Sequence, residues 1–152
     1  MHKFVKWFIV TAVTLSGAAI AYNFGILGLI LQSDVTFLSL LIMVLFLVST
    51  AIAGNVAHAA GQRPSGREDA KYFSSRLRLL KFLAEHFFTL GLLGTIIGFC
   101  YMMQGALVDT LDVGEVIKQL KTGMATALYT TLTGIVSSLL LQLQIFLIED
   151  YE

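Results

Sequence analysis

Formal charges are distributed along this chain in a way that suits a membrane and not water. Between Lys6 and Arg63 the only charged residue is Asp34, and residues 86–108 and 122–148 carry none. Each uncharged run is near or above the roughly 20 residues that cross a hydrocarbon core about 30 Å thick as an α-helix. The pattern predicts an all-α, polytopic membrane protein.

Four apolar runs predict four transmembrane helices within a single membrane domain, residues 1–152. The runs lie at about residues 4–31, 35–53, 86–104 and 122–148. The first two are separated by so short a connection that they must form an antiparallel hairpin. Nothing interrupts helical propensity from Glu68 to Phe99. We therefore expect one long helix that extends from the cytoplasm into the third span.

The first apolar run has two interpretations. Lys3 and Lys6 precede it and Ala19-Ile20-Ala21 resembles a cleavage site, as in a secretory signal peptide. Apolarity continues beyond that site to Leu31, which is too long for a simple signal. We expect the segment to remain as a membrane anchor.

Basic residues indicate the orientation of the spans, because cytoplasmic loops carry an excess of Lys and Arg. Lysines precede the first span, and the loop at about residues 54–85 is rich in Lys and Arg. Both segments are expected in the cytoplasm, which places residues 105–121 on the opposite side and both termini in the cytoplasm. Within the loop, Arg76, Arg78 and Lys81 are expected near the headgroups. They would bind anionic lipid or a partner or, as we favour, anchor the interface.

Several classes of function are disfavoured by the composition. A net charge of zero and the absence of a basic face argue against nucleic-acid binding. The single cysteine, Cys100, allows neither an intrachain disulfide nor a cysteine-rich metal site. No catalytic constellation or metal-ligand spacing is visible, so we expect neither an enzyme nor a cofactor. No ionisable residue lies in the middle of a span, so the chain lacks its own intramembrane proton carrier.

Small and hydroxylated residues follow helical spacing in the last two spans. At 100° per residue, a hydroxyl stripe falls within roughly 80° on the fourth span: Thr122, Thr126, Thr130, Thr133 and Ser137. The residues expected to pack helices closely are Gly91, Gly94 and Gly98, the last two spaced as GxxxG, with Gly123, Ala127, Gly134 and Ser138. The alternative is that each hydroxyl bonds a carbonyl of its own helix. Five aligned hydroxyls favour a pore or a partner groove.

Two segments resemble the paired signature of the MotA/TolQ/ExbB proton-channel family. They are LGLLGTIIGF, Leu90 to Phe99, and GMATALYTTLTGI, Gly123 to Ile135. The family motifs read approximately GLLGTV-x-G and GI-x-x-AL-x-T-T-x-x-GL, on consecutive spans joined by a periplasmic segment. Order, spacing and topology agree over residues 90–138.

The resemblance implies a bacterial inner-membrane protein in which a homopentamer surrounds two single-span helices of a partner. The partner's intramembrane Asp would carry the ion, H⁺ in preference to Na⁺, through lipid-embedded subunits. Thr95 and Thr131 match the family's hydroxyls at the pore. Together with the stripe, this predicts a pore lining of Thr95, Thr126, Thr130, Thr131, Thr133 and Ser137.

The chain departs from the family pattern at two places. Thr126 stands where TolQ and ExbB carry a glutamate, which moves the resemblance toward MotA. The cytoplasmic loop of about 30 residues is much shorter than in flagellar MotA, so we do not predict coupling to a flagellar rotor. The leading hypothesis is an ion-channel subunit of a stator-type rotary motor driven by an ion gradient. The alternative is a passive membrane scaffold or pore-forming oligomer without an ion-carrying partner.

Overall fold

A computed structural model of the protein describes residues 2–23, 25, 28, 34, 36–61, 67–106 and 113–149. These residues form long helices and contain no β-strand. The helices are α1 (His2–Asn23), α3 (Leu38–Gly61), α4 (Arg67–Ala106) and α5 (Val113–Glu149). The chain's one proline, Pro64, precedes α4, so none of the four helices contains the residue that most disrupts a helix.

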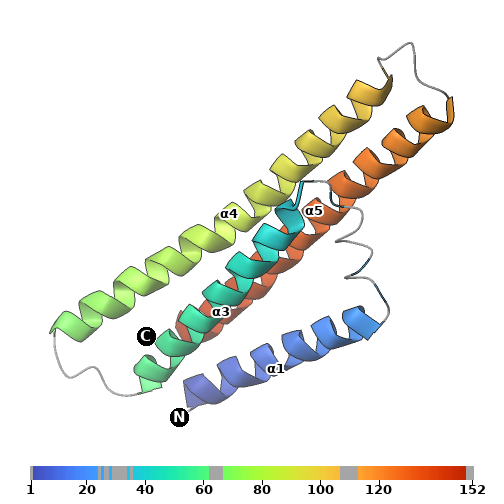
Figure 1. Ribbon diagram of the computed structural model, residues 1–152. Helices are drawn as coiled ribbons and strands as arrows, with labels where there is room; N and C mark the ends of the chain where they lie inside the picture. The colour runs from blue at the N-terminus through green and yellow to red at the C-terminus, as the bar shows by residue number, and fades with distance from the viewer. Residues whose placement is uncertain are drawn as a thin grey trace.

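The bundle is organised around an antiparallel pair of helices, α4 and α5, which run side by side along their lengths (Figure 1). Helix α3 packs against both members of this pair, whereas α1 contacts α3 and α5. The start of α1, the end of α3, the start of α4 and the end of α5 lie at the same end of the bundle (Figure 1). The pair thus provides the frame on which the other helices pack.

Three of the four helices are long and apolar enough to cross a membrane. They are the segments Leu38–Ala59 of α3, Lys71–Gln104 of α4 and Val113–Glu149 of α5. The structure therefore agrees with an all-α membrane protein and identifies three of the four spans expected from the sequence. The remaining expected span, at the N-terminus, stays a prediction.

The helix bounds differ from the apolar runs at several ends. Helix α1 ends at Asn23, well before Leu31, because Gly25 adopts a left-handed φ of 71° and its N–H donates to the Tyr22 carbonyl at 2.9 Å. Helix α3 continues beyond Ala53 to Gly61, and α5 begins at Val113 rather than near Thr122. Apolarity marks the hydrocarbon region, and the helices extend beyond it. The added turns of α5 contain Glu115, Lys118 and Lys121, which have good helix propensity.

The start of α3 is held by a buried carboxylate, Asp34. One oxygen accepts hydrogen bonds from the Thr36 N–H at 3.0 Å and the Thr36 hydroxyl at 2.6 Å. The other accepts from the Ser39 N–H at 2.6 Å, in the first turn of α3. Phe37 between them has φ 54°, an uncommon left-handed conformation for a bulky residue. Asp34 thus caps the helix and holds a strained connection in place.

The hydrophobic core lies where α3, α4 and α5 meet near the shared end of the bundle. Phe87 of α4 is almost fully buried and meets Phe46 of α3 edge to face, with ring centroids 6.4 Å apart. Trp7 brings α1 against α3 at Gly54, where a Cβ would lie 2.6 Å from the indole ring. The buried apolar residues are Ile42, Ala53, Val56, Ala57, Leu80, Ala84, Phe87, Leu141, Ile145 and Ile148.

Large apolar side chains also cover the outside of the bundle. Only 22% of the most apolar part of α4, long enough to cross a membrane, is buried within the protomer. Contiguous exposed apolar surface of this kind needs lipid or another protein chain to cover it. Prominent examples are Phe8, Leu41, Phe88, Leu92, Ile96, Phe99, Leu128, Leu132 and Leu139.

Asp34→Ala is expected to lower the free energy of unfolding by about 1 kcal/mol, as loss of a helix cap usually does. Burial raises the pKa of the Asp34 carboxyl, but hydrogen bonds from Thr36 and Ser39 outweigh it and hold the pKa below its ordinary value. The stabilisation is therefore present above the unfolded pKa, near 4, and is lost as the pH falls through the lower folded pKa.

Thermal unfolding in mild detergent checks this, at neutral pH and in steps below about pH 4. The parent protein should lose more stability on acidification than the Asp34→Ala variant. Asp34→Asn is the matched control, because it keeps an acceptor oxygen at the cap and removes the titration. Identical acid sensitivity of all three proteins would contradict the assignment.

Candidate functional site

Helices α4 and α5 approach each other so closely that their contact accepts only glycine at several positions. A Cβ built on Gly98 would lie 2.7 Å from the Gly123 carbonyl oxygen, and one on Gly123 would lie 2.6 Å from the Gly98 carbonyl oxygen. A Cβ on Gly134 would likewise lie 2.6 Å from the carbonyl oxygen of Phe87. Real side chains do not approach backbone oxygens this closely, so the absence of a Cβ sets the separation of the two helices.

Two further glycines of α4, Gly91 and Gly94, accommodate threonines of α5. A Cβ on Gly94 would overlap the Thr130 side chain, and one on Gly91 would lie 3.3 Å from the Thr131 Cα and 3.1 Å from the Gly134 Cα. Ala127 packs opposite Gly98 in the same contact. The glycines that the sequence predicted for close helix packing thus lie in the contact between α4 and α5 of a single protomer.

Thr95 of α4 and Thr131 of α5 form a hydroxyl pair across this contact. Their Oγ1 atoms are hydrogen bonded to each other, and either can be the donor. Thr131 Oγ1 also lies 2.8 Å from the Ala127 carbonyl oxygen and 3.2 Å from that of Gly91. Thr95 Oγ1 lies 3.3 Å from the Gly91 carbonyl oxygen. Both threonines are half-buried, so the pair lies at an accessible edge of the helix contact.

Three other threonines of α5 donate their hydroxyl hydrogens to carbonyls of their own helix. Thr130 donates to the Thr126 carbonyl at 2.7 Å, and Thr133 donates to the Tyr129 carbonyl at 2.8 Å. Thr122 does the same with the Lys118 carbonyl at 2.9 Å. This is the ordinary role of a helical threonine in an apolar environment. A hydrogen bond between the two helices distinguishes the pair Thr95 and Thr131 from these residues.

Burial divides the hydroxyl stripe into two groups. The side chains of Thr126, Thr130 and Ser137 are 1%, 0% and 6% exposed, inside the protomer, whereas Thr133 is half-buried. A helical wheel aligns these residues on one face of α5, but part of that face is covered within the protomer, where Thr130 packs against Gly94 of α4. A pore lining of Thr126, Thr130, Thr133 and Ser137 stays a prediction. Within one protomer, Thr126, Thr130 and Ser137 are buried and act as packing residues.

A second polar connection between α4 and α5 lies toward the shared end of the bundle. Ser138 donates its hydroxyl hydrogen to the Ala84 carbonyl at 2.7 Å, and the Gln142 amide donates to Ser138 Oγ at 3.1 Å. Sequence reasoning placed Ser138 on the packing stripe but missed Gln142. The i, i+4 spacing of the two residues is the signal that could have found it.

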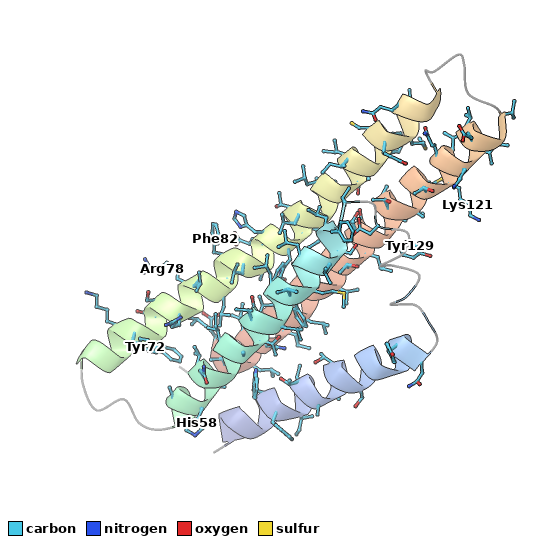
Figure 2. All side chains as sticks on the ribbon, viewed as in Figure 1. His58, Tyr72, Arg78, Phe82, Lys121 and Tyr129 are labelled. Atoms are coloured by element: carbon cyan, nitrogen blue, oxygen red, sulfur yellow. The ribbon has the colours of Figure 1, made fainter. Side chains whose placement is uncertain are left out.

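The basic residues of the expected interface make local contacts on α4. The Arg76 guanidinium lies over the Tyr72 ring, 5.1 Å from its centroid. Lys81 Nζ forms an ion pair with Glu149 Oε1 of α5 at 2.5 Å. Figure 2 shows Tyr72 and Arg78 along the first half of α4, whereas Lys121 and Tyr129 belong to α5 nearer the other end. An Arg held by a tyrosine and a Lys held by a glutamate suit interfacial anchoring.

The described residues contain no group of three or more His, Cys, Asp or Glu side chains able to hold a metal ion. Cys100 is exposed on α4, in the apolar part of the helix. Residues 86–108 and 122–148 contain no Asp, Glu, Lys or Arg, so the polar groups in the middle of the α4/α5 contact are neutral hydroxyls and backbone carbonyls.

A comparison with models of known protein families identifies the family of this chain. The model of the MotA/TolQ/ExbB proton channel family matches residues 63–147, more than half of the chain. The chain belongs to this family. The match spans α4 and most of α5, which hold the glycine contact and the hydroxyl pair, and it confirms the resemblance seen in the sequence motifs. In the corresponding searches, no curated protein and no solved structure matches the chain.

Gly98→Leu is expected to force α4 and α5 apart and lower the free energy of unfolding by about 3 kcal/mol, because overpacking a rigid contact displaces backbone. Leu132→Ala is the control, since Leu132 is 54% exposed on the opposite side of α5. Its loss should cost less than about 1 kcal/mol. Thermal unfolding and oligomer yield in mild detergent measure both variants. Equal losses would show that the glycine contact does not hold the helices together.

Proposed function

We propose that this chain is the channel subunit of a stator-type motor complex in the bacterial inner membrane. Five copies surround two single-span helices of a partner, and an intramembrane Asp of that partner carries the ion. Ion flow down its gradient drives rotation of one component against the other. Membership of the proton channel family and three apolar helices support the coarse assignment.

The hydroxyl pair formed by Thr95 and Thr131 is the observation that carries this proposal. It lies in the two segments that bear the family motifs, and it is half-buried at the edge of the α4/α5 contact. An ion or a protonated carboxyl that crosses apolar surroundings needs polar groups to replace its hydration. The pair supplies two hydroxyls at one level, held in place by a glycine contact that cannot easily relax.

The lack of charged residues in the apolar parts of α4 and α5 supports a partner that supplies an acidic side chain. Residues 86–108 and 122–148 contain no Asp, Glu, Lys or Arg, so the apolar parts of α4 and α5 offer dipoles but no titratable carboxylate. A carboxylate from the partner would bind the ion, become neutral and pass through the apolar region next to Thr95 and Thr131. H⁺ is favoured over Na⁺ because a protonated carboxyl needs fewer oxygen ligands than a metal cation does.

Exposed apolar surface supports a ring of several copies. The least buried membrane helix, α4, belongs to the helix pair that carries the family motifs. In the proposed ring α4 and α5 face the axis, and α1 and α3 face lipid. The basic residues Arg76 and Arg78 lie at the cytoplasmic surface.

The first test is the mass of the intact complex extracted in mild detergent. We expect five copies of this chain, together with two copies of a single-span protein that contains an Asp in its membrane segment. A dimer of this chain, or a density map with α1 and α3 along the axis, would overturn the arrangement.

The second test replaces both pore-edge hydroxyls, as Thr95→Val with Thr131→Val. Ion flux in liposomes containing chain and partner should fall about tenfold or more, because each lost hydrogen bond is worth about 1 kcal/mol. Assembly should persist, since Val matches the shape of Thr. The control is Thr11→Val with Thr14→Val, whose hydroxyls bond carbonyls within α1 at 2.9 and 2.8 Å.

The same flux assay separates a motor subunit from a passive oligomer. A ring without its partner should conduct few ions, because its apolar helices carry no ionisable residue along residues 86–108 and 122–148. Rapid flux without the partner would favour a simple pore. Undiminished flux in the double Val variant with the partner present would remove these threonines from the mechanism.

A further inference from the structure

A groove opens on the surface of the α4/α5 pair toward the shared end of the bundle. Its volume is about 430 Å³, and one wall comes from α4 and the other from α5. Apolar side chains form most of the walls, and three polar side chains from both helices face the same space. The lining residues are Glu85, Phe88, Ile135, Ser138, Leu139 and Gln142.

The groove lies on the same face of the helix pair as the hydroxyl pair. Phe88 precedes Thr95 by two helical turns and Ser138 follows Thr131 by two turns, so each shares its neighbour's face. Glu85 lies ten residues before Thr95, about 15 Å along the helix at 1.5 Å per residue. That distance is about half of a hydrocarbon core, so an ion leaving the threonine level along this face reaches the groove near the membrane surface.

The groove offers several acceptor oxygens. Ser138 gives its hydrogen to the Ala84 carbonyl, and the Gln142 amide nitrogen is turned toward Ser138 Oγ. This arrangement leaves the Gln142 amide oxygen without a hydrogen bond among the described residues. The carboxylate of Glu85 adds two further oxygens and a negative charge. A cation is the ligand that such a set attracts.

Glu85 has no ion pair among the described residues. The nearest Lys or Arg on its own helix, Lys81, lies one turn earlier and is held by Glu149 at 2.5 Å, and the adjacent His86 places its Nδ1 2.8 Å from the Phe82 carbonyl oxygen. Glu85 is also the last charged residue before the uncharged run 86–108. It is therefore the first fixed charge that a cation meets when it moves from Thr95 toward this end of α4.

We propose that the Glu85 carboxylate, with the Gln142 amide oxygen beside it, binds the transported cation at the mouth of the ion pathway. Ser138 is a positioning residue that orients Gln142. The fixed negative charge attracts hydronium or Na⁺ to a narrow, partly apolar exit and raises its local concentration. This inference rests on the proposed function and extends it from the middle of the membrane to the end of the pathway predicted to be cytoplasmic.

The test is ion flux in liposomes that contain the complete complex of chain and partner. Glu85→Gln keeps size and hydrogen bonding but removes the charge, and should lower flux about tenfold, the low end of electrostatic focusing in a charged cleft. Glu115→Gln is the matched control. Glu115 is an exposed glutamate in the first turn of α5, at the other end of the bundle, and its loss should leave flux unchanged.

Chemical restoration of the charge separates an electrostatic role from a structural one. In a Cys100→Ser background, Glu85→Cys provides one reactive thiol per chain. Reaction with sulfonatoethyl methanethiosulfonate adds a negative charge and should restore flux, whereas the trimethylammonium reagent adds a positive charge and should not. Equal flux after both reagents would overturn the proposal, including in the case that Glu85→Gln impairs assembly.

The outcomes also distinguish this inference from the function beneath it. Normal flux in Glu85→Gln, with flux that depends on the partner and on Thr95 and Thr131, would overturn the proposed cation site at Glu85. The proposed function as a motor subunit would still stand. Absence of partner-dependent flux in the unsubstituted complex would overturn the proposed function itself and the mouth with it. Lowered flux in Glu85→Gln, unchanged flux in Glu115→Gln and rescue by the sulfonate alone would support the proposal.

Discussion

The close contact of α4 and α5 is the constraint on which the rest of the structure depends. Backbone oxygens of Gly98 and Gly123 stand where side chains would otherwise lie, and Gly134 reaches the backbone of Phe87 in the same way. In lipid, the hydrophobic effect does not hold two apolar helices together, so dispersion and interhelical hydrogen bonds must do so. A contact without Cβ atoms brings enough backbone and side-chain surface within reach to achieve this.

The same contact creates the polar features of the site. Thr95 and Thr131 can meet because Gly91 leaves its carbonyl accessible between them, and Ser138 reaches the Ala84 carbonyl two turns further along α5. These hydrogen bonds fix the rotation of each helix as well as the distance between them. A helix pair locked in this way is a rigid wall, which suits a subunit against which another component moves.

Because the apolar parts of α4 and α5 carry no charged residue, the proposed function divides the chemistry of the complex between two proteins. This chain supplies hydroxyls and carbonyls at the level of Thr95, whereas its fixed charges begin only at Glu85 and beyond. In the proposed complex, placing the titratable acid on a separate partner would let the ion site move while the wall remains still. The proposed mouth at Glu85 would then be the stationary charge toward which the mobile site discharges.

The sequence by itself determined the fold class, the family and the segments that contain the site. Uncharged runs in a chain of this kind must form helices, because backbone groups in hydrocarbon have no water to bond. The motifs at residues 90–99 and 123–135 identified the family, and the spacing of Gly94 and Gly98 indicated close approach. Helix ends were less predictable, as at Asn23, because a left-handed turn at Gly25 leaves no trace in hydropathy.

Only the tertiary structure decided which polar residues face one another. Thr130 and Thr131 are neighbours in the sequence, yet the first is fully buried against Gly94 and the second lies at the accessible edge beside Thr95. A helical wheel gives the angle between two residues on one helix, but not which angle a neighbouring helix covers. That depends on where the neighbouring helices pack. The groove at Glu85 depends on helix packing too, because its two walls come from different helices, α4 and α5.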